Sequence, residues 1–206
     1  MYKKIVTIMC VLLLTACTNQ TYYLNNLTYE DIINISINET EKTTNINNKG
    51  YKYYLPTGFI VSKDNGYNQE LLSDDNTKYY LNVDIVSYYY KNKMQSTHNI
   101  KDYKYYEFEY KDKTGYLKIT ENNDNFFVEL CYNYAIIEVE VEERKIQYAV
   151  SRGITILSSI RYNDYVIEKQ LNDKDLDSKE TAYKIPEPKD KNETKNVLEY
   201  MNDDEE

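Results

Sequence analysis

The sequence predicts an α+β fold in which an antiparallel β-sheet meander packs against helices. Stretches of alternating apolar and polar residues, joined by short polar turns, are typical of half-buried strands. After them comes a stretch in which apolar residues recur every three or four positions, as on one face of a helix. A sheet with one apolar face and an amphipathic helix to cover it fits a single layered domain, which we place over residues 28–162.

The N-terminal residues 1–16 have the features of a lipoprotein signal peptide. Two lysines precede an apolar run over residues 5–14, which as a helix would rise only about 15 Å, half the thickness of a bilayer core. The run closes on Leu14-Thr15-Ala16-Cys17, which resembles a bacterial lipobox. This resemblance implies a lipid on Cys17 that holds the chain at the extracytoplasmic face of the cell membrane, with residues 17–27 as a tether. A plain secretory signal, in which Cys17 is incidental, is the alternative.

The first element of the predicted domain is a helix over residues 29–37. Thr28 offers an N-cap oxygen, and Asp31 stands three positions later, where its carboxylate can complete a capping box. Isoleucines fill the apolar positions of this segment, and their β-branching lowers helix propensity. The prediction of a helix here therefore depends mainly on the capping residues Thr28 and Asp31.

The centre of the chain is predicted to form strands. Short runs come first and end at a turn at Asn65-Gly66, and the clearest alternation then sets Leu81 and Val83 against Asn82. Later runs are separated by polar turns of a few residues, which makes them an antiparallel meander. The predicted strands cover residues 51–56, 58–61, 79–89, 106–110, 117–119 and 126–132.

The end of the domain is predicted to be helical. Apolar residues between Ile146 and Leu157 fall on one face of a helix, which we expect over residues 142–157, and residues 158–162 could add a short last strand. Residues 163–206 are rich in acids, poor in core-forming residues and interrupted by proline, so we expect a disordered acidic tail.

One short motif resembles a known family. Leu55-Pro56-Thr57-Gly58-Phe59 is similar to the opening of PsbP-like domains, and the helix that runs into Ser158-Ser159-Ile160 resembles their closing segment. The resemblance implies a layered sandwich with an antiparallel sheet between helices, and it implies no activity because the family is functionally diverse. The chain is also similar to lipoproteins of low-GC Gram-positive bacteria.

Composition limits the partners. The chain carries a formal charge of −9, which argues against nucleic acid and anionic lipid headgroups as ligands and leaves basic partners and metal cations compatible. Cys131 is the one cysteine outside the signal segment and Cys17, so no intramolecular disulfide is expected. A buried and unreactive thiol is the expected state of Cys131.

Residues that could carry chemistry are few, and we predict no catalytic residues, no cofactor and no metal site. There is no nucleophile elbow, no phosphate-binding glycine loop and no zinc-protease motif, and His98 is the single histidine. Acidic clusters at Asp74-Asp75 and around Glu138 and Glu140 could bind a hard cation but lack the spacing of an EF-hand. Solvated surface charge is the expected role of both clusters.

Tyrosine is unusually abundant, with 25 residues. The run Tyr88-Tyr89-Tyr90 stands at the end of the predicted strand over residues 79–89, so at least one ring should face solvent. Exposed tyrosines are enriched in binding surfaces, which makes Tyr88, Tyr89 and Tyr90 the candidate binding surface. The alternative is that tyrosine serves here as a general core and sheet residue.

These observations favour a non-enzymatic, membrane-anchored extracytoplasmic binding or interaction module with an envelope protein as partner. Two alternatives stay open. One is a receptor for a small ligand or a cell-wall component, associated with transport, and the other is a hydrolase that uses carboxylates alone.

Overall fold

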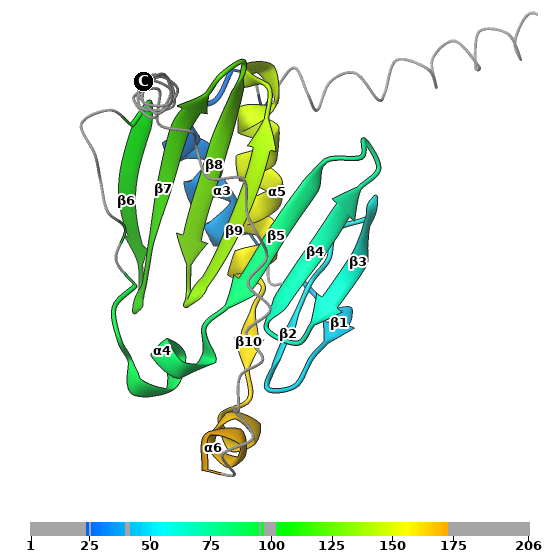
Figure 1. The fold of residues 1–206 in the computed structure, drawn as a ribbon. Helices are drawn as coiled ribbons and strands as arrows, with labels where there is room; N and C mark the ends of the chain where they lie inside the picture. The colour runs from blue at the N-terminus through cyan, green and yellow to red at the C-terminus, as the bar shows by residue number, and fades with distance from the viewer. Residues whose placement is uncertain (1–23, 25, 40–41, 95, 97–101, 173–206) are drawn as a thin grey trace, which may run out of the picture.

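The computed structural model describes residues 24, 26–39, 42–94, 96 and 102–172 (Figure 1). Within them, antiparallel strands and helices form an α+β fold with a sheet packed against helices, as the sequence predicts. The helices are α3 (Tyr29–Asn38), α4 (Ile85–Tyr90), α5 (Ile146–Ser158) and α6 (Asp164–Asn172), and the 3-10 turn η1 (Glu143–Lys145) precedes α5.

The larger sheet has seven antiparallel strands in the order β3-β4-β5-β9-β8-β7-β6. Its C-terminal half is the meander that the alternation predicts. The strands are β3 (Phe59–Asn65), β4 (Asn68–Ser73), β5 (Lys78–Val83), β6 (Lys104–Tyr110), β7 (Lys113–Asn122), β8 (Asn125–Tyr132) and β9 (Ala135–Val141). A smaller sheet in the order β1-β2-β10 consists of β1 (Ile46–Asn47), β2 (Tyr51–Tyr53) and β10 (Arg161–Tyr162).

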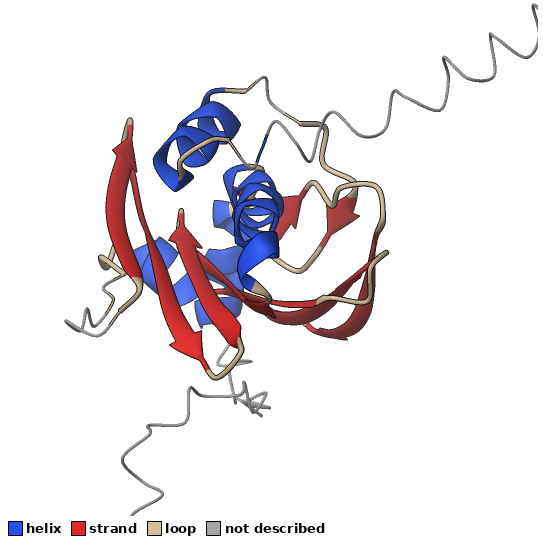
Figure 2. Ribbon diagram, turned by 90° about the horizontal axis from the view of Figure 1, so that it is seen from above, coloured by secondary structure: helices blue, strands red, loops and turns tan. Residues whose placement is uncertain are grey.

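One face of the large sheet carries the core. Helix α5 packs on β8 and β9, and α3 packs beside α5 on the same side of the sheet (Figures 1 and 2). At Gly153 of α5 an added Cβ would lie 3.2 Å from Leu130 of β8, so the helix backbone approaches the sheet closely. The small sheet contacts β4, because the buried Tyr53 hydroxyl donates a 2.7 Å hydrogen bond to Gln69. The described helices α3 and α5 thus cover one face of the sheet and do not enclose it from both sides.

The first helix begins where the cap predicts. Thr28 is the N-cap of α3, its hydroxyl oxygen accepts a 3.1 Å hydrogen bond from the Asp31 backbone N–H, and the Asp31 carboxylate accepts one from the Thr28 backbone in return. Ile32 and Ile33 of this helix are buried in the core. Packing against α5 therefore compensates for their weak helix propensity.

The strand predicted over residues 79–89 is too long. Strand β5 ends at Val83, and Asp84 then caps α4 by accepting a 2.8 Å hydrogen bond from the Ser87 backbone N–H. Tyr88, Tyr89 and Tyr90 therefore lie on a short helix and not at the end of a strand. Aspartate is a preferred N-cap residue, but the alternation of apolar and polar residues up to this point led us to include Asp84 in the strand.

Two strands of the large sheet have no counterpart in the prediction. Residues 68–73 form β4, which is buried on most of its length, and residues 135–141 form β9 at the centre of the sheet. In β9 the acids Glu138 and Glu140 alternate with buried Ile137 and Val139. Glu140 therefore belongs to a strand, and the helical segment predicted over residues 142–157 begins with η1 at Glu143.

The fold continues past Tyr162, where we placed its end. Residues 164–172 of the expected tail form α6, and Ile167 on this helix is fully buried in the core. Residues 173–206 lie outside the described part of the chain, as do residues 1–16 and Cys17. Among the residues that the structure describes, no helix is long and apolar enough to cross a membrane.

Candidate functional site

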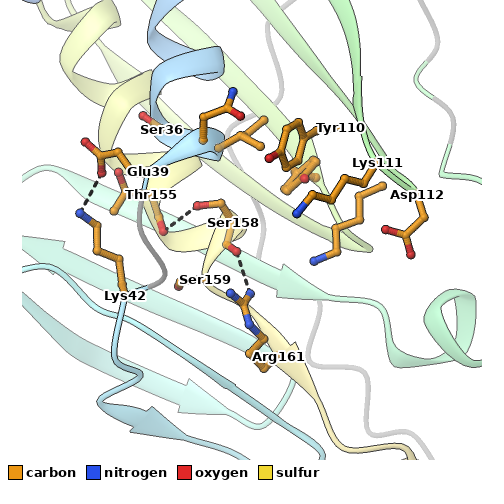
Figure 3. Close-up of a pocket in the computed structure, with 14 residues that line it drawn as sticks. Ser36, Glu39, Lys42, Tyr110, Lys111, Asp112, Thr155, Ser158, Ser159 and Arg161 are labelled. Carbon is orange, nitrogen blue, oxygen red and sulfur yellow. Dashed lines mark hydrogen bonds and ion pairs between the residues drawn. The ribbon is translucent and has the colours of Figure 1, made fainter.

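An open groove lies where α3, α5, the β6–β7 turn and β10 meet (Figure 3). Its cavity volume is about 340 Å³, within the range of small-ligand sites. We call it the cationic groove because four positively charged side chains line it, namely Lys42, Lys111, Lys113 and Arg161. These residues come from separate segments of the chain, and only the fold brings them together.

The ends of two helices fix one wall of the groove. Helix α5 ends at Ser158, and its backbone carbonyl accepts a 2.9 Å hydrogen bond from Arg161, which also donates to the carbonyl of Ile160. The end of α3 lies close by, where Lys42 pairs with Glu39 at 2.8 Å. Carbonyls at helix C-termini carry partial negative charge, which explains why cations gather here.

The opposite wall is the tight turn between β6 and β7. Lys111 occupies the left-handed backbone region with φ of 57°, where glycine and asparagine are the common residues. Its ammonium lies 5.1 Å from the centre of the Tyr110 ring and points into the groove, whereas the neighbouring Asp112 carboxylate points away (Figure 3). The backbone conformation of the turn does not favour lysine, so it does not account for the positive charge at this edge of the groove.

The charge of the groove is opposite to that of the chain. Its lining holds four cations and two carboxylates, Glu39 and Asp112, which leaves a net charge of +2 in a chain of −9. The Debye length at physiological ionic strength is about 8 Å, so a small anion in the groove experiences mainly this local charge. A long polyanion would also experience the acidic surface beyond the groove.

Hydroxyl groups complete the lining. Thr155 and Ser158 donate to backbone carbonyls of α5, so in this arrangement neither hydroxyl is hydrogen-bonded to a general base. Tyr132 forms part of the floor, where burial and the nearby Asp112 raise the pKa of its hydroxyl to about 12, which keeps it protonated as a donor. Thr155 and Ser158 therefore supply neither an activated nucleophile nor a free donor for an anion, which leaves recognition of an anion to the cations of the lining.

The residues of the predicted tyrosine surface have different roles. Tyr88 stacks on Tyr162 with ring centres 3.8 Å apart, and its hydroxyl donates a 2.7 Å hydrogen bond to Asp164 of α6. Tyr89 and Tyr90 are exposed by 36% and 60%. Tyr88 is partly buried, so Tyr89 and Tyr90 are the exposed tyrosines of the run, at the end of the molecule that α4 and α6 form (Figure 1).

Other candidate residues lie apart from the groove. Cys131 is buried, as expected, and burial followed by the nearby Glu129 raises the pKa of its thiol to about 12. Asp74 accepts hydrogen bonds from Arg152, and Asp75 pairs with Lys145 at 2.9 Å, so this acidic cluster is neutralised by cations of α5 and the turn before it. His98 lies outside the described residues. In the described part of the chain, no three acidic, cysteine or histidine side chains form a group that could hold a metal ion.

Two carboxylates face each other on the opposite side of the sheet. Glu129 of β8 pairs directly with Glu138 of β9, and the Tyr116 hydroxyl donates a 2.5 Å hydrogen bond to Glu129. Burial, and then the Glu129 charge, raises the pKa of Glu138 to about 7. These are acids in unlike environments, but neither lines the cationic groove.

Sequence reasoning missed the cationic groove. Its cations lie between positions 42 and 161, in an acidic chain and without a motif. A lysine in the tight turn before β7 was the one available signal, and it is weak without the fold. No protein-family model matches the chain, and no curated protein sequence matches it significantly. The interpretation of the groove therefore rests on its own residues.

Proposed function

We propose that this chain is a lipid-anchored extracytoplasmic binding module whose cationic groove recognises a compact oxyanion, a carboxylate or a phosphate, on a component of the cell envelope. The observation that carries the proposal is the concentration of four cations in one groove of an acidic chain. Lysine ammonium groups and arginine guanidinium groups are the side chains that bind carboxylates and phosphates most strongly.

The position of the groove suits a protein held at a membrane. The lipobox-like tetrapeptide would place the lipid on Cys17, seven residues before Leu24, which packs against the core near the start of α3. Seven residues span at most about 25 Å. The groove lies at the other end of α3, and ten helical residues add about 15 Å. A domain tethered in this way could hold the groove up to about 40 Å from the lipidated cysteine.

The groove also bears on the alternatives. A receptor for a small ligand or cell-wall component, associated with transport, would bind its ligand through the same cations. It would differ from the proposed module only in passing that ligand to a transporter. A carboxylate hydrolase would use another place, the outer sheet face with Glu129 and Glu138. The hydroxyls of Thr155 and Ser158 donate to backbone carbonyls, so neither is activated as a nucleophile, which supports binding in the groove without a reaction there.

The test is a binding measurement on the full, lipidated chain in nanodiscs of neutral lipid. The probes are soluble muropeptides, whose stem peptides carry carboxylates, and glycerol phosphate. We expect saturable binding to at least one probe and an affinity about tenfold lower for Lys111→Asn, because each charge-assisted contact contributes roughly 1.5–3 kcal/mol at most and less when exposed.

The chain offers a matched control for this substitution. Lys91 at the end of α4 has nearly the same left-handed backbone, with φ of 55°, and lies outside the cationic groove. Lys91→Asn removes the same charge from the same backbone conformation and should leave the affinity unchanged. Equal loss in both variants would mean that overall charge and not the groove controls binding. No binding of either probe to the wild-type chain or to the variants would reject these ligands.

A further inference from the structure

We infer that the acidic end of this chain, Asp203-Asp204-Glu205-Glu206, docks in the cationic groove and competes there with the external anion. This inference rests on the proposed function, because it adds regulation to the same groove. The proposed occupant of the groove is a segment of the chain outside the described residues, and three observations support its docking there.

The first observation is charge complementarity. Residues 173–206 hold twelve acids and six lysines, a net charge of −6, and the last four residues are all acidic. The groove has a net charge of +2 in its lining, with Lys111 pointing into it (Figure 3). A run of adjacent carboxylates is the kind of ligand that several cations from different segments can bind together.

The second observation is the place where this segment leaves the fold. Arg161 of the groove belongs to β10, and α6 follows β10 after a single residue, Asn163. Asn163 is held to the small sheet by a 2.8 Å backbone hydrogen bond to Gly50. Helix α6 has nine residues and rises about 13 Å. Asn172, where the remaining chain begins, is therefore within about 20 Å of the groove wall.

The third observation is length. Thirty residues lie between Asn172 and Asp203, and a chain of that length can extend to about 100 Å. The distance to be covered is only about 20 Å, so the acidic end can reach the groove, and its effective concentration there is in the millimolar range. Even weak individual ion pairs can keep the groove occupied at such a concentration.

Docking has a functional consequence. A tail that occupies the groove about nine-tenths of the time lowers the apparent affinity for an external anion about tenfold, since only the free fraction can bind. Ligands with a single weak anionic group would be excluded, and a ligand would need further contacts, or a high local concentration, to displace the tail. The groove would thus respond to dense envelope surfaces and not to free anions.

The experiment compares three forms of the lipidated chain in neutral nanodiscs: the full chain, a chain ending at Asn172, and a full-length chain with Asp203→Asn, Asp204→Asn, Glu205→Gln and Glu206→Gln. The first readout needs no ligand. Carbodiimide joins a carboxylate to a contacting amine without a spacer, and mass spectrometry maps the products. We expect links from residues 203–206 to Lys111 or Lys113 in the full chain, and their loss at high salt.

The second readout is the affinity for the muropeptide and glycerol phosphate probes. We expect about tenfold tighter binding for the truncated and the neutralised chains than for the full chain. Links to the groove without probe binding in any form would support docking and reject the proposed external ligands. Absence of the links, with equal affinity in all three forms, would overturn docking and leave the proposed function intact. Links that map mainly outside the groove would also overturn it.

Discussion

At the scale of single residues, the carboxyl of Glu138 lies in an environment that disfavours its charged form. It lies on the outer face of the sheet directly opposite Glu129, which already accepts a hydrogen bond from Tyr116. Two facing carboxylates repel each other, and burial disfavours the charged form of Glu138 further. The pair therefore keeps one proton at neutral pH more readily than exposed acids do.

This arrangement predicts how stability depends on pH. The pKa of Glu138 rises from 4.5 to about 7 on folding, so between these values the folded chain holds a proton that the unfolded chain releases. The contribution is complete below pH 4.5 and is lost as the pH rises through 7. A shift of this size corresponds to about 3 kcal/mol, which partial exposure reduces to on the order of 1–2 kcal/mol.

Glu138→Gln should therefore be more stable than the wild-type chain at pH 8, by on the order of 1–2 kcal/mol, and about equally stable at pH 4. Urea unfolding at both pH values measures the difference. Glu121→Gln, at an exposed position of β7, is the matched control and should change little at either pH. An advantage of Glu138→Gln that is the same at both pH values would contradict a titrating carboxyl as its cause.

At the scale of elements, the described part of the domain extends to the end of α6 at Asn172. Its Ile167 is fully buried, and a Cβ added to Gly50 in the turn before β2 would lie only 2.9 Å from the Ile167 side chain. The same helix accepts the Tyr88 hydrogen bond through Asp164, which connects it to α4. Helix α6 is thus part of the core and positions the start of the acidic tail.

Ile167→Ala should cost about 2–5 kcal/mol of unfolding free energy, because it leaves a cavity where α6 meets the turn before β2. Chemical denaturation of the purified chain measures this loss. Tyr165→Ala changes a side chain on the same helix that is 74% exposed, and it should stay within about 0.5 kcal/mol of the wild type. If Ile167→Ala were as mild as Tyr165→Ala, α6 would not pack on the domain.

The same elements show what the sequence could and could not predict. The cap at Thr28, the alternation of β6 to β8 and the apolar face of α5 are local signals, and they predicted the α+β class correctly. Strand β9 was missed because Glu138 and Glu140 were interpreted as an acidic cluster, although they alternate with apolar residues. Helix α6 was missed because one buried isoleucine is a weak signal in an acidic stretch. The groove depends on contacts between distant segments, which no local pattern encodes.

The run Tyr88-Tyr89-Tyr90 shows that a local pattern can also give the wrong secondary structure. Its assignment to a strand placed three rings on alternating faces, whereas α4 turns Tyr88 inward against Tyr162 and leaves Tyr89 and Tyr90 accessible. The hydroxyl of Tyr88 has a pKa of about 12, raised by burial and by the hydrogen bond to Asp164, so it remains a donor. A partner surface at this end of the molecule would therefore use Tyr89 and Tyr90 and not Tyr88.

At the scale of the whole molecule, the two ends of the chain have opposite roles in the proposal. The N-terminal segment would hold the domain at the membrane, and the acidic C-terminal segment would occupy the cationic groove and compete with external anions. The folded part between them places Leu24 near the start of α3 and the cationic groove near its end. Anchoring and recognition can then be separated by substitution, because no residue takes part in both.

Acyl chains contribute about 0.8 kcal/mol per buried methylene, so the proposed lipid on Cys17 would hold the chain at the membrane and Cys17→Ala should release it. Fractionation of cells, with mass spectrometry of the N-terminal peptide for the added lipid, measures the change. Cys10→Ala, within the apolar run of the signal segment, is the matched control and should leave both lipid and location unaltered. A Cys17→Ala chain that still sediments with membranes after an alkaline wash would show that another segment anchors it, and the groove would then need a different orientation relative to the bilayer.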